Sequence, residues 1–221
     1  IKPFIGVGAK YIWYFAIGLH IILIVYFTIK FLLKLQMPKV FASYFIVYVG
    51  IAVAAVTAPA FEELAIGAGA FWFGFLTLIG LLVLVTIRYM KYKEIPEPAK
   101  PLFCIYAAPT SLCVAGYVQS VTPKSREFLL AMLLVATVLY VLALVKAISY
   151  LKLKFYPSYA AFTFPFVISA IATKQTMVCL ANMKQPIPML RYVVLIETVI
   201  AVLFMIYTFI RFLQFIFVDH K

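Results

Sequence analysis

Seven long apolar stretches follow one another along the chain, and the short segments between them carry most of the charge. A helix needs about 20 apolar residues to cross a hydrocarbon core of about 30 Å. Backbone groups in lipid must satisfy their own hydrogen bonds, so each stretch is predicted to be a transmembrane helix. The predicted spans are 11–33, 40–60, 64–87, 101–122, 128–145, 155–173 and 192–210.

A proline motif marks alternate spans. The fourth span begins PLFCIYAAP (101–109) and the sixth begins PSYAAFTFP (157–165), so each has two prolines eight residues apart. The second span begins at Pro38 but has Ile46 where the second proline would stand. A pair of helices therefore repeats about every 60 residues, with the marked helix first in each pair.

Pro109 and Pro165 divide the predicted helices into two kinds. A proline inside a helix removes a backbone hydrogen bond and kinks the helix. In lipid, such a kink is tolerated where neighbouring helices or water satisfy the freed carbonyl. The sequence thus predicts an all-α integral membrane protein of repeated helical hairpins, with Pro-kinked inner pore helices surrounded by smoother outer helices. A role of the kinks in packing alone remains the alternative.

The composition excludes several classes of function. Hydrophobic residues make up 67% of the chain and charged residues 12%, against about 45–50% and about 25% in soluble proteins. The net charge of +12 is spread between apolar runs, which argues against a nucleic-acid partner. The only aspartate is Asp219. No carboxylate metal cage or catalytic carboxylate pair is expected, so we predict no enzyme activity, no metal and no cofactor.

The distribution of basic residues predicts the orientation. One side of the membrane is assigned twelve of them: Lys30, Lys34, Lys39, Arg88, Lys91, Lys93, Lys100, Lys146, Lys152, Lys154, Arg211 and Lys221. The other side is assigned seven: Lys2, Lys10, Lys124, Arg126, Lys174, Lys184 and Arg191. The positive-inside rule places the richer side, and with it the C-terminus, in the cytoplasm of a multi-pass cell-membrane protein.

Two proline-containing segments resemble a known family. FYPSYAAFTFP (155–165) with VISA (167–170) is similar to the ninth helix of the TehA-like family, and APTSL (108–112) with Gly116 and Tyr117 is similar to its seventh. The family includes tellurite-resistance proteins, dicarboxylate transporters and the plant slow-type anion channels. The resemblance implies ten helices in five hairpins and a homotrimer with one pore in each protomer. Residues 1–221 would be a single membrane domain resembling helices four to ten, and thus a fragment of a ten-helix protein.

Phe164 is the candidate gate. It lies near the middle of the sixth span and directly precedes Pro165. A bulky apolar ring at this depth can close a narrow pore by excluding water, and the resemblance implies a phenylalanine gate on this helix. Phe45 and Ala108 occupy the same register, seven residues after the first proline of their repeats, and Phe45 is therefore predicted as a second gate residue. The alternative is that Phe164 simply packs.

Small and hydroxyl-bearing residues near Phe164 are the candidate pore lining. Alanine side chains leave room for an ion beside the ring, which nominates Ala108, Ala160, Ala161 and Ala172. Hydroxyl donors to an anion are available from Thr110, Ser111, Thr163 and Ser169, although such hydroxyls more often bond to the preceding turn of their own helix.

Glu197 and His20 are ionisable residues within the predicted spans. Glu197 of the seventh span and Lys174 at the end of the sixth are expected on the same side of the membrane, where a structural ion pair is the favoured interpretation. His20 in the first span is interpreted as a histidine that packs between helices.

These features together predict passive flow of small inorganic or organic anions through a Phe-gated pore in a lipid bilayer. The alternatives are a proton-coupled carrier of a dicarboxylate such as malate, or a tellurite-resistance exporter. A proton-coupled carrier needs a relay of ionisable groups within the membrane, and these spans offer few.

The orientation can be tested in the loop at residues 89–100. We expect a cysteine placed by Glu94→Cys to be protected from an impermeant thiol reagent added outside intact cells, because this loop belongs to the more basic side. The native cysteines, Cys104, Cys113 and Cys179, lie inside apolar segments. Labelling of Glu94→Cys from outside without permeabilisation would reverse the assigned topology.

Overall fold

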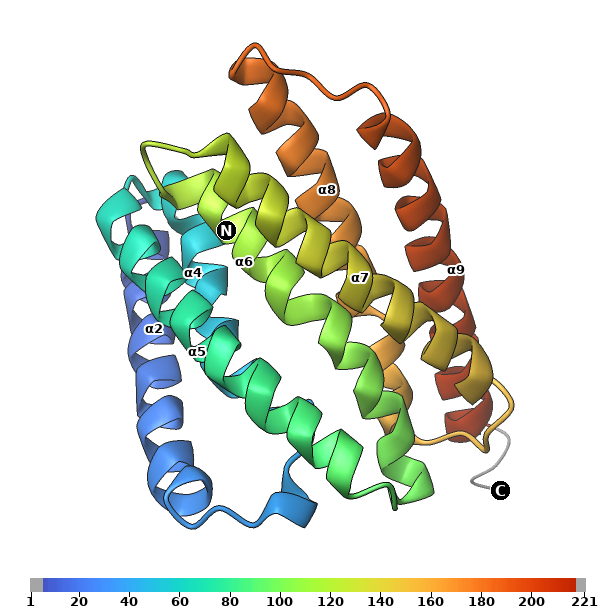
Figure 1. Ribbon diagram of the computed structural model, residues 1–221. Coiled ribbons are helices and arrows are strands. Elements are labelled where there is room, and N and C mark those ends of the chain that lie inside the picture. Colours follow the sequence, from blue (N-terminus) through green and yellow to red (C-terminus); the bar gives the residue numbers. More distant parts are fainter. Residues whose placement is uncertain (1–5, 218–221) are drawn as a thin grey trace.

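The computed structural model describes residues 6–217, which form a bundle of seven membrane-length helices (Figure 1). The prediction of an all-α integral membrane protein is confirmed. The continuous spans are α2 (Gly8–Phe27) with its π-helical extension η1 (Thr28–Leu32), α5 (Leu64–Lys91), α7 (Arg126–Tyr150) and α9 (Leu190–Phe217).

The second, fourth and sixth spans are each assembled from shorter helical pieces. A single turn, η2 (Met37–Lys39), precedes the second span, which comprises α3 (Tyr44–Tyr48), η3 (Val49–Ile51), α4 (Ala52–Thr57) and η4 (Ala58–Phe61). The fourth consists of η5 (Glu97–Tyr106) and α6 (Ala107–Ser120), and the sixth of η6 (Pro157–Phe162) and α8 (Phe164–Asn182). The η segments of these three spans are 3-10 helices.

The repeated prolines fall where 3-10 helix changes to α-helix. Pro109 is the third residue of α6, and Pro165 is the second residue of α8. The first N–H groups of an α-helix have no acceptor within that helix, so a proline there removes no hydrogen bond from it. Thr163 separates η6 from α8, with φ −97° and ψ −84°. The second span is interrupted at η3 without a proline.

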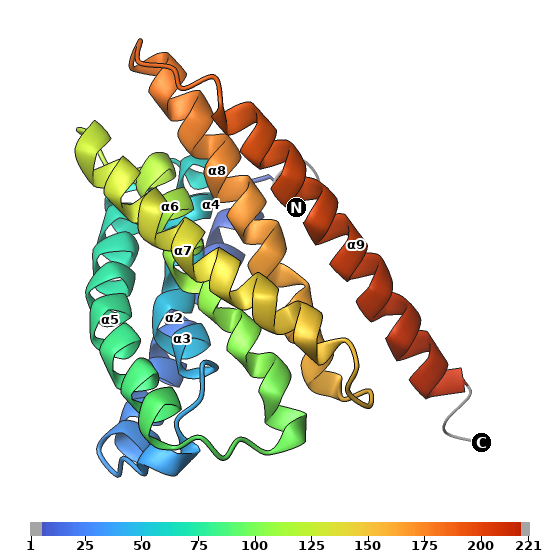
Figure 2. The same cartoon turned by 45° about the vertical axis from the view of Figure 1, so that its right-hand side comes forward.

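Burial separates the broken spans from the continuous ones. In the most apolar 18 residues of each broken span, at least half are buried, whereas a third or fewer are buried in each continuous span. The fourth span is the most buried, and α6 packs against α4, α5, α7 and α8. In Figure 2, α9 lies at one edge of the bundle, where it packs against α8.

Small side chains allow the helices around α6 to approach closely. A Cβ atom added at Gly67 of α5 would lie 2.3 Å from the Ser120 Oγ and 2.6 Å from the Ala58 Cβ. The Ser120 hydroxyl in turn donates to the Ala55 carbonyl. Small residues at helix contacts are typical of membrane bundles, because association there depends on close packing.

A polar contact ties α2 to the turn between the second and third spans. The Lys10 ammonium and the Tyr14 hydroxyl both bond to the Glu63 carboxylate. The hydrogen bond from Lys10, followed by that from Tyr14, lowers the pKa of the Glu63 carboxyl. The carboxylate is therefore ionised at neutral pH and holds the two helices together at this end of the bundle.

The helices differ in length from the predicted spans. The sixth continues to Asn182 and the seventh to Phe217, well past the predicted ends at 173 and 210. Lys174 and Gln175 end the apolar run but are good helix formers, so the helix continues through them. Lys2, Asp219 and Lys221, which entered the sequence analysis, lie outside the described residues.

Arg88 is buried, although its position in the sequence suggested a charge in a loop. It is 1% exposed, and its guanidinium donates to the Pro38 carbonyl at 3.1 Å and to the Tyr92 carbonyl at 3.0 Å. The guanidinium also lies over the Phe41 ring, 4.6 Å from its centroid. Arg88 therefore fastens the end of α5 to the start of the second span.

Loss of the hydrogen bonds made by Arg88 should lower the stability of the protein. We expect Arg88→Ala to reduce the free energy of unfolding by about 2–4 kcal/mol, because two carbonyls lose a charged donor. The exposed Lys91 at the same end of α5 provides the control, and Lys91→Ala should change stability by less than about 0.5 kcal/mol. Thermal unfolding in detergent measures both. Equal melting temperatures for Arg88→Ala and the wild type would contradict this role.

Candidate functional site

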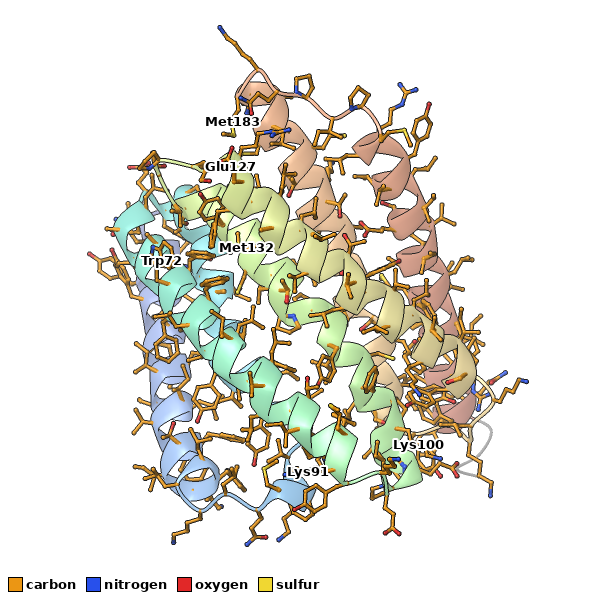
Figure 3. The ribbon with its side chains drawn as sticks, viewed as in Figure 1. Trp72, Lys91, Lys100, Glu127, Met132 and Met183 are labelled. Carbon is orange, nitrogen blue, oxygen red and sulfur yellow. The ribbon has the colours of Figure 1, made fainter. Side chains whose placement is uncertain are left out.

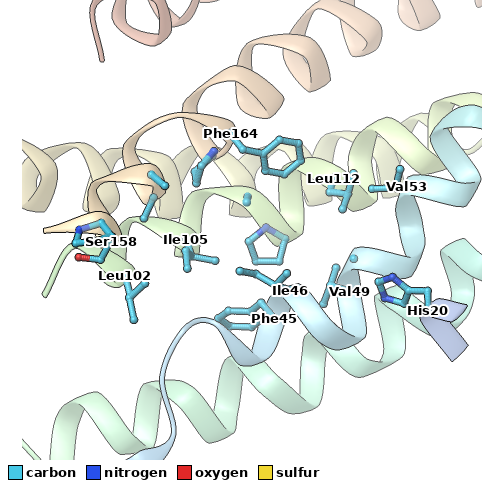
Figure 4. Close-up of a pocket in the computed structure, with 17 residues that line it drawn as sticks. His20, Phe45, Ile46, Val49, Val53, Leu102, Ile105, Leu112, Ser158 and Phe164 are labelled. Carbon is cyan, nitrogen blue, oxygen red and sulfur yellow. The ribbon is translucent and has the colours of Figure 1, made fainter. Parts of the chain in front are cut away.

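A cavity of about 620 Å³ lies where the three broken spans meet (Figure 4). The second span contributes Phe45, Ile46, Val49, Gly50 and Val53. The fourth contributes Leu102, Ile105, Ala108, Pro109 and Leu112, and the sixth contributes Pro157, Ser158, Ala160, Ala161, Phe164 and Pro165. His20 of α2 completes the lining, to which α5, α7 and α9 contribute no residue.

Equivalent positions of the sequence repeat converge on this cavity. Phe45, Ala108 and Phe164 each stand seven residues after the first proline of their repeat, and all three line it. The next positions, Ile46, Pro109 and Pro165, line it as well. The sequence repeat therefore corresponds to a structural repeat, in which equivalent residues of three helices line one cavity.

Phe164 is a half-exposed aromatic side chain in the cavity wall. It is 49% exposed, and within residues 6–217 its ring stacks on no other aromatic ring. Phe162 and Phe166, two residues to either side, are fully buried and pack against Phe204 with centroid distances of 5.8 and 4.6 Å. The backbone break at Thr163 thus leaves one ring facing the cavity and two rings facing the core.

Phe45 is held more tightly than Phe164. It is 1% exposed, and its ring packs edge-on against Tyr106 with the centroids 5.3 Å apart. Figure 4 shows Phe45 and Phe164 on opposite sides of the cavity. Phe45 is therefore a fixed part of one wall, while the opposite wall carries a ring with room to move.

The candidate alanines divide into two groups. Ala108, Ala160 and Ala161 line the cavity, as nominated from the sequence. Ala172 does not line it, and its side chain is 1% exposed in the main hydrophobic core. It stands eight residues after Phe164, which rotates it by roughly 80° around the helix.

The candidate hydroxyls do not line the cavity. Thr163 donates to the Ala160 carbonyl at 2.7 Å and Ser111 to the Ala107 carbonyl at 2.8 Å. The Ser169 hydroxyl lies 2.9 Å from the Pro165 carbonyl and 3.0 Å from the Ser111 hydroxyl. Thr110 is buried away from the cavity. Three of these four side chains therefore form hydrogen bonds to backbone carbonyls beside the helix breaks.

The prediction of an ion pair between Glu197 and Lys174 is wrong, because these residues do not form one in the described structure. Glu197 is 4% exposed, and one of its carboxylate oxygens has no hydrogen-bond partner there. Lys174 is exposed and lines a second cavity near the end of α8. The two residues stand on different helices whose facing sides could not be assigned from periodicity, because both surroundings are apolar.

His20 is a cavity residue that the sequence analysis did not identify. Its Nε2 lies 2.8 Å from the Val47 carbonyl, two residues before the 3-10 segment of the second span. A carbonyl only accepts, so Nε2 carries the proton and Nδ1 is unprotonated in the neutral ring. Gly50 leaves space for this ring, because a Cβ atom there would lie 3.1 Å from the His20 Cε1.

The lining has few groups that could bind a charged species directly. His20 is its only titratable side chain, and it contains no cluster of carboxylate, thiolate or imidazole groups. Within residues 6–217, no group of three or more His, Cys, Asp or Glu side chains is placed to hold a metal. The cavity can therefore admit a small solute, and His20 is the one side chain in its lining that could take part in proton transfer or metal ligation.

A family model for "Voltage-dependent anion channel" matches residues 4–213, nearly the whole chain. Searches of curated proteins and of solved structures gave no match.

The bond from His20 predicts a stability effect. We expect His20→Ala to lower the free energy of unfolding by about 1–2 kcal/mol, because the Val47 carbonyl loses its side-chain donor. The control is Leu19→Ala, which removes an exposed side chain from the adjacent position of α2. Circular dichroism melts in detergent compare the two. A His20→Ala protein no less stable than the control would show that this bond does not support the second span.

Proposed function

The chain belongs to the voltage-dependent anion channel family, and we propose that anions pass through the cavity between its broken helices, with the Phe164 ring as the gate. Membership makes the protein a multi-pass membrane protein that conducts or transports anions. Passive flow, the ring gate and a place in the cell membrane are our proposal. The observation that carries it is the convergence of three repeated helices on one cavity that contains a half-exposed phenylalanine.

The dry lining explains how a ring can act as a gate. Most lining side chains are aliphatic, aromatic or proline, so little favours water in a constricted part of the space. A narrow apolar constriction closes a pore by excluding water, without a charged barrier. A modest movement of one ring then decides whether a hydrated path exists.

Phe164 suits this role better than Phe45. Its ring is half exposed and has no aromatic neighbour to hold it, and the break at Thr163 leaves it at the first position of α8. Phe45 is buried against Tyr106 and moves only if the core around it also moves. We assign gating to Phe164 and a fixed wall to Phe45. Pro109 and Pro165 keep the helix breaks at the depth of the cavity.

The lining favours a channel over a proton-coupled dicarboxylate carrier. The cavity contains no carboxylate, and the buried Glu197 lies on α9, outside the lining. Reversal potentials in chloride, nitrate and malate, with and without a pH gradient, separate these mechanisms. A reversal potential that follows the anion gradient alone supports a channel, whereas one that moves with the pH gradient supports proton coupling.

The assembly implied by the family resemblance is also part of the proposal. The open side of the cavity, beside Phe164 and Ala160, would face further helices of a ten-helix protein. Three such protomers would associate through the apolar outer helices. Functional experiments therefore use the full-length protein, and its mass in detergent or nanodiscs tests the trimer.

The gate is tested by truncation of the ring. In the full-length protein, Phe164→Ala should raise anion conductance by roughly an order of magnitude, because removal of the ring opens a path that water can fill. Phe164→Leu should be intermediate. Since Phe164 is half exposed, we expect a stability loss well below the 3–5 kcal/mol typical of a buried Phe→Ala change. Equal currents from wild type and Phe164→Ala would remove Phe164 from the mechanism.

Two matched substitutions separate gating from packing. Phe209→Ala truncates an exposed ring on α9 and should leave both conductance and stability near wild type. Phe45→Ala should instead lower the free energy of unfolding by about 3–5 kcal/mol, because its ring is buried. Surface expression and elution on size exclusion establish that each variant folds before its currents are compared.

A further inference from the structure

A second cavity, of about 600 Å³, lies between the C-terminal parts of α6 and α8. Met183, which lines it, stands at the end of the bundle opposite Lys91 and Lys100 (Figure 3). The cavity is therefore at the end that the basic-residue count assigns to the non-cytoplasmic side. The first cavity lies nearer the starts of the same two spans.

The two cavities share one face of each helix. On α8, the second cavity is lined by Ile171, Gln175, Val178 and Asn182, which stand 7, 11, 14 and 18 residues after Phe164. At 3.6 residues per turn, these positions lie within about 40° of Phe164 around the helix. On α6, Gln119 stands seven residues after Leu112, again on nearly the same face. The cavities therefore follow one another along a single strip.

The chemistry changes along this strip. The first cavity is almost entirely apolar, whereas the second is lined by two lysines, Lys124 and Lys174, together with side-chain amides. It has no carboxylate in its lining, and neither lysine forms an ion pair among the described residues. Within the described residues, the charges of Lys124 and Lys174 are consequently not paired with a carboxylate.

Gln175 gives a second indication of a polar occupant. Its Oε1 is buried and has no hydrogen-bond partner within the described chain. An unsatisfied buried amide is costly, and rotation of the amide by 180° would present two N–H donors at the same place. Water or a bound solute in the cavity would satisfy either arrangement.

We infer that this second cavity is an anion-binding vestibule, in which Lys124 and Lys174 concentrate small hydrated anions at the mouth of the path toward Phe164. The inference rests on the proposed conduction pathway. Ammonium groups remain strongly hydrated and act as point charges, so they attract an anion without removing its water. Two unneutralised charges in a recess raise the local anion concentration, and added salt screens the effect.

The test compares conductance at low and high chloride in the full-length protein, in wild-type and Phe164→Ala backgrounds. We expect the double substitution Lys124→Gln and Lys174→Gln to reduce conductance roughly threefold or more at 10 mM chloride, with recovery toward the parent at 1 M. The loss should be larger for anions that enter from the side of Lys124. Arginine at both positions should restore the low-salt conductance, because the charge is retained.

Lys184→Gln is the matched control, since Lys184 is exposed just beyond α8 at the same end but does not line the cavity. A reduction equal to that of the double variant would indicate general surface charge and overturn the vestibule. Unchanged low-salt conductance in the double variant would also overturn the vestibule. If Phe164→Ala still raises the current in that experiment, the proposed conduction pathway is unaffected. Absence of anion current in both backgrounds would remove the pathway and the vestibule together.

Discussion

A helix that breaks inside a membrane must find partners for the backbone groups that the break releases, and this requirement organises the whole protein. Each of the three broken spans has a side chain beside its interruption that donates to a carbonyl. Thr163 donates to the Ala160 carbonyl, Ser111 to the Ala107 carbonyl, and His20 to the Val47 carbonyl. The polar groups near the cavity are thus largely committed to the backbone, which leaves the space itself apolar.

The same requirement explains the two classes of helix. Continuous helices satisfy their own backbones, so α5, α7 and α9 can face lipid with large exposed aliphatic side chains. Broken helices need protein on most sides, and α6 accordingly packs against four neighbours. Gly67 and Ser120 allow these neighbours to come close enough to exclude lipid from the broken backbone.

The cavity follows from the register of the sequence repeat. Side chains at equivalent repeat positions of the three broken spans line one common space. Thr163 turns Phe164 away from the buried rings of Phe162 and Phe166, so a bulky group faces the open space and is not locked into the core.

By itself, the sequence determined the number of spans and the Pro-marked repeat, because hydropathy and proline act locally along the chain. The predicted place of Phe164 at the middle of its span is wrong, because the helix continues to Asn182 and Phe164 is the first residue of α8. Only the tertiary structure decided which side chains share a space. Ala172 packs into the core, His20 reaches the cavity from another hairpin, Arg88 is buried against Pro38, and Lys174 stands apart from Glu197. In a chain that is apolar both toward lipid and toward its own interior, periodicity does not distinguish the two surroundings. Two of the partners of buried polar groups are far away in sequence, Pro38 for Arg88 and His20 for the Val47 carbonyl, and these contacts are set only when the helices pack.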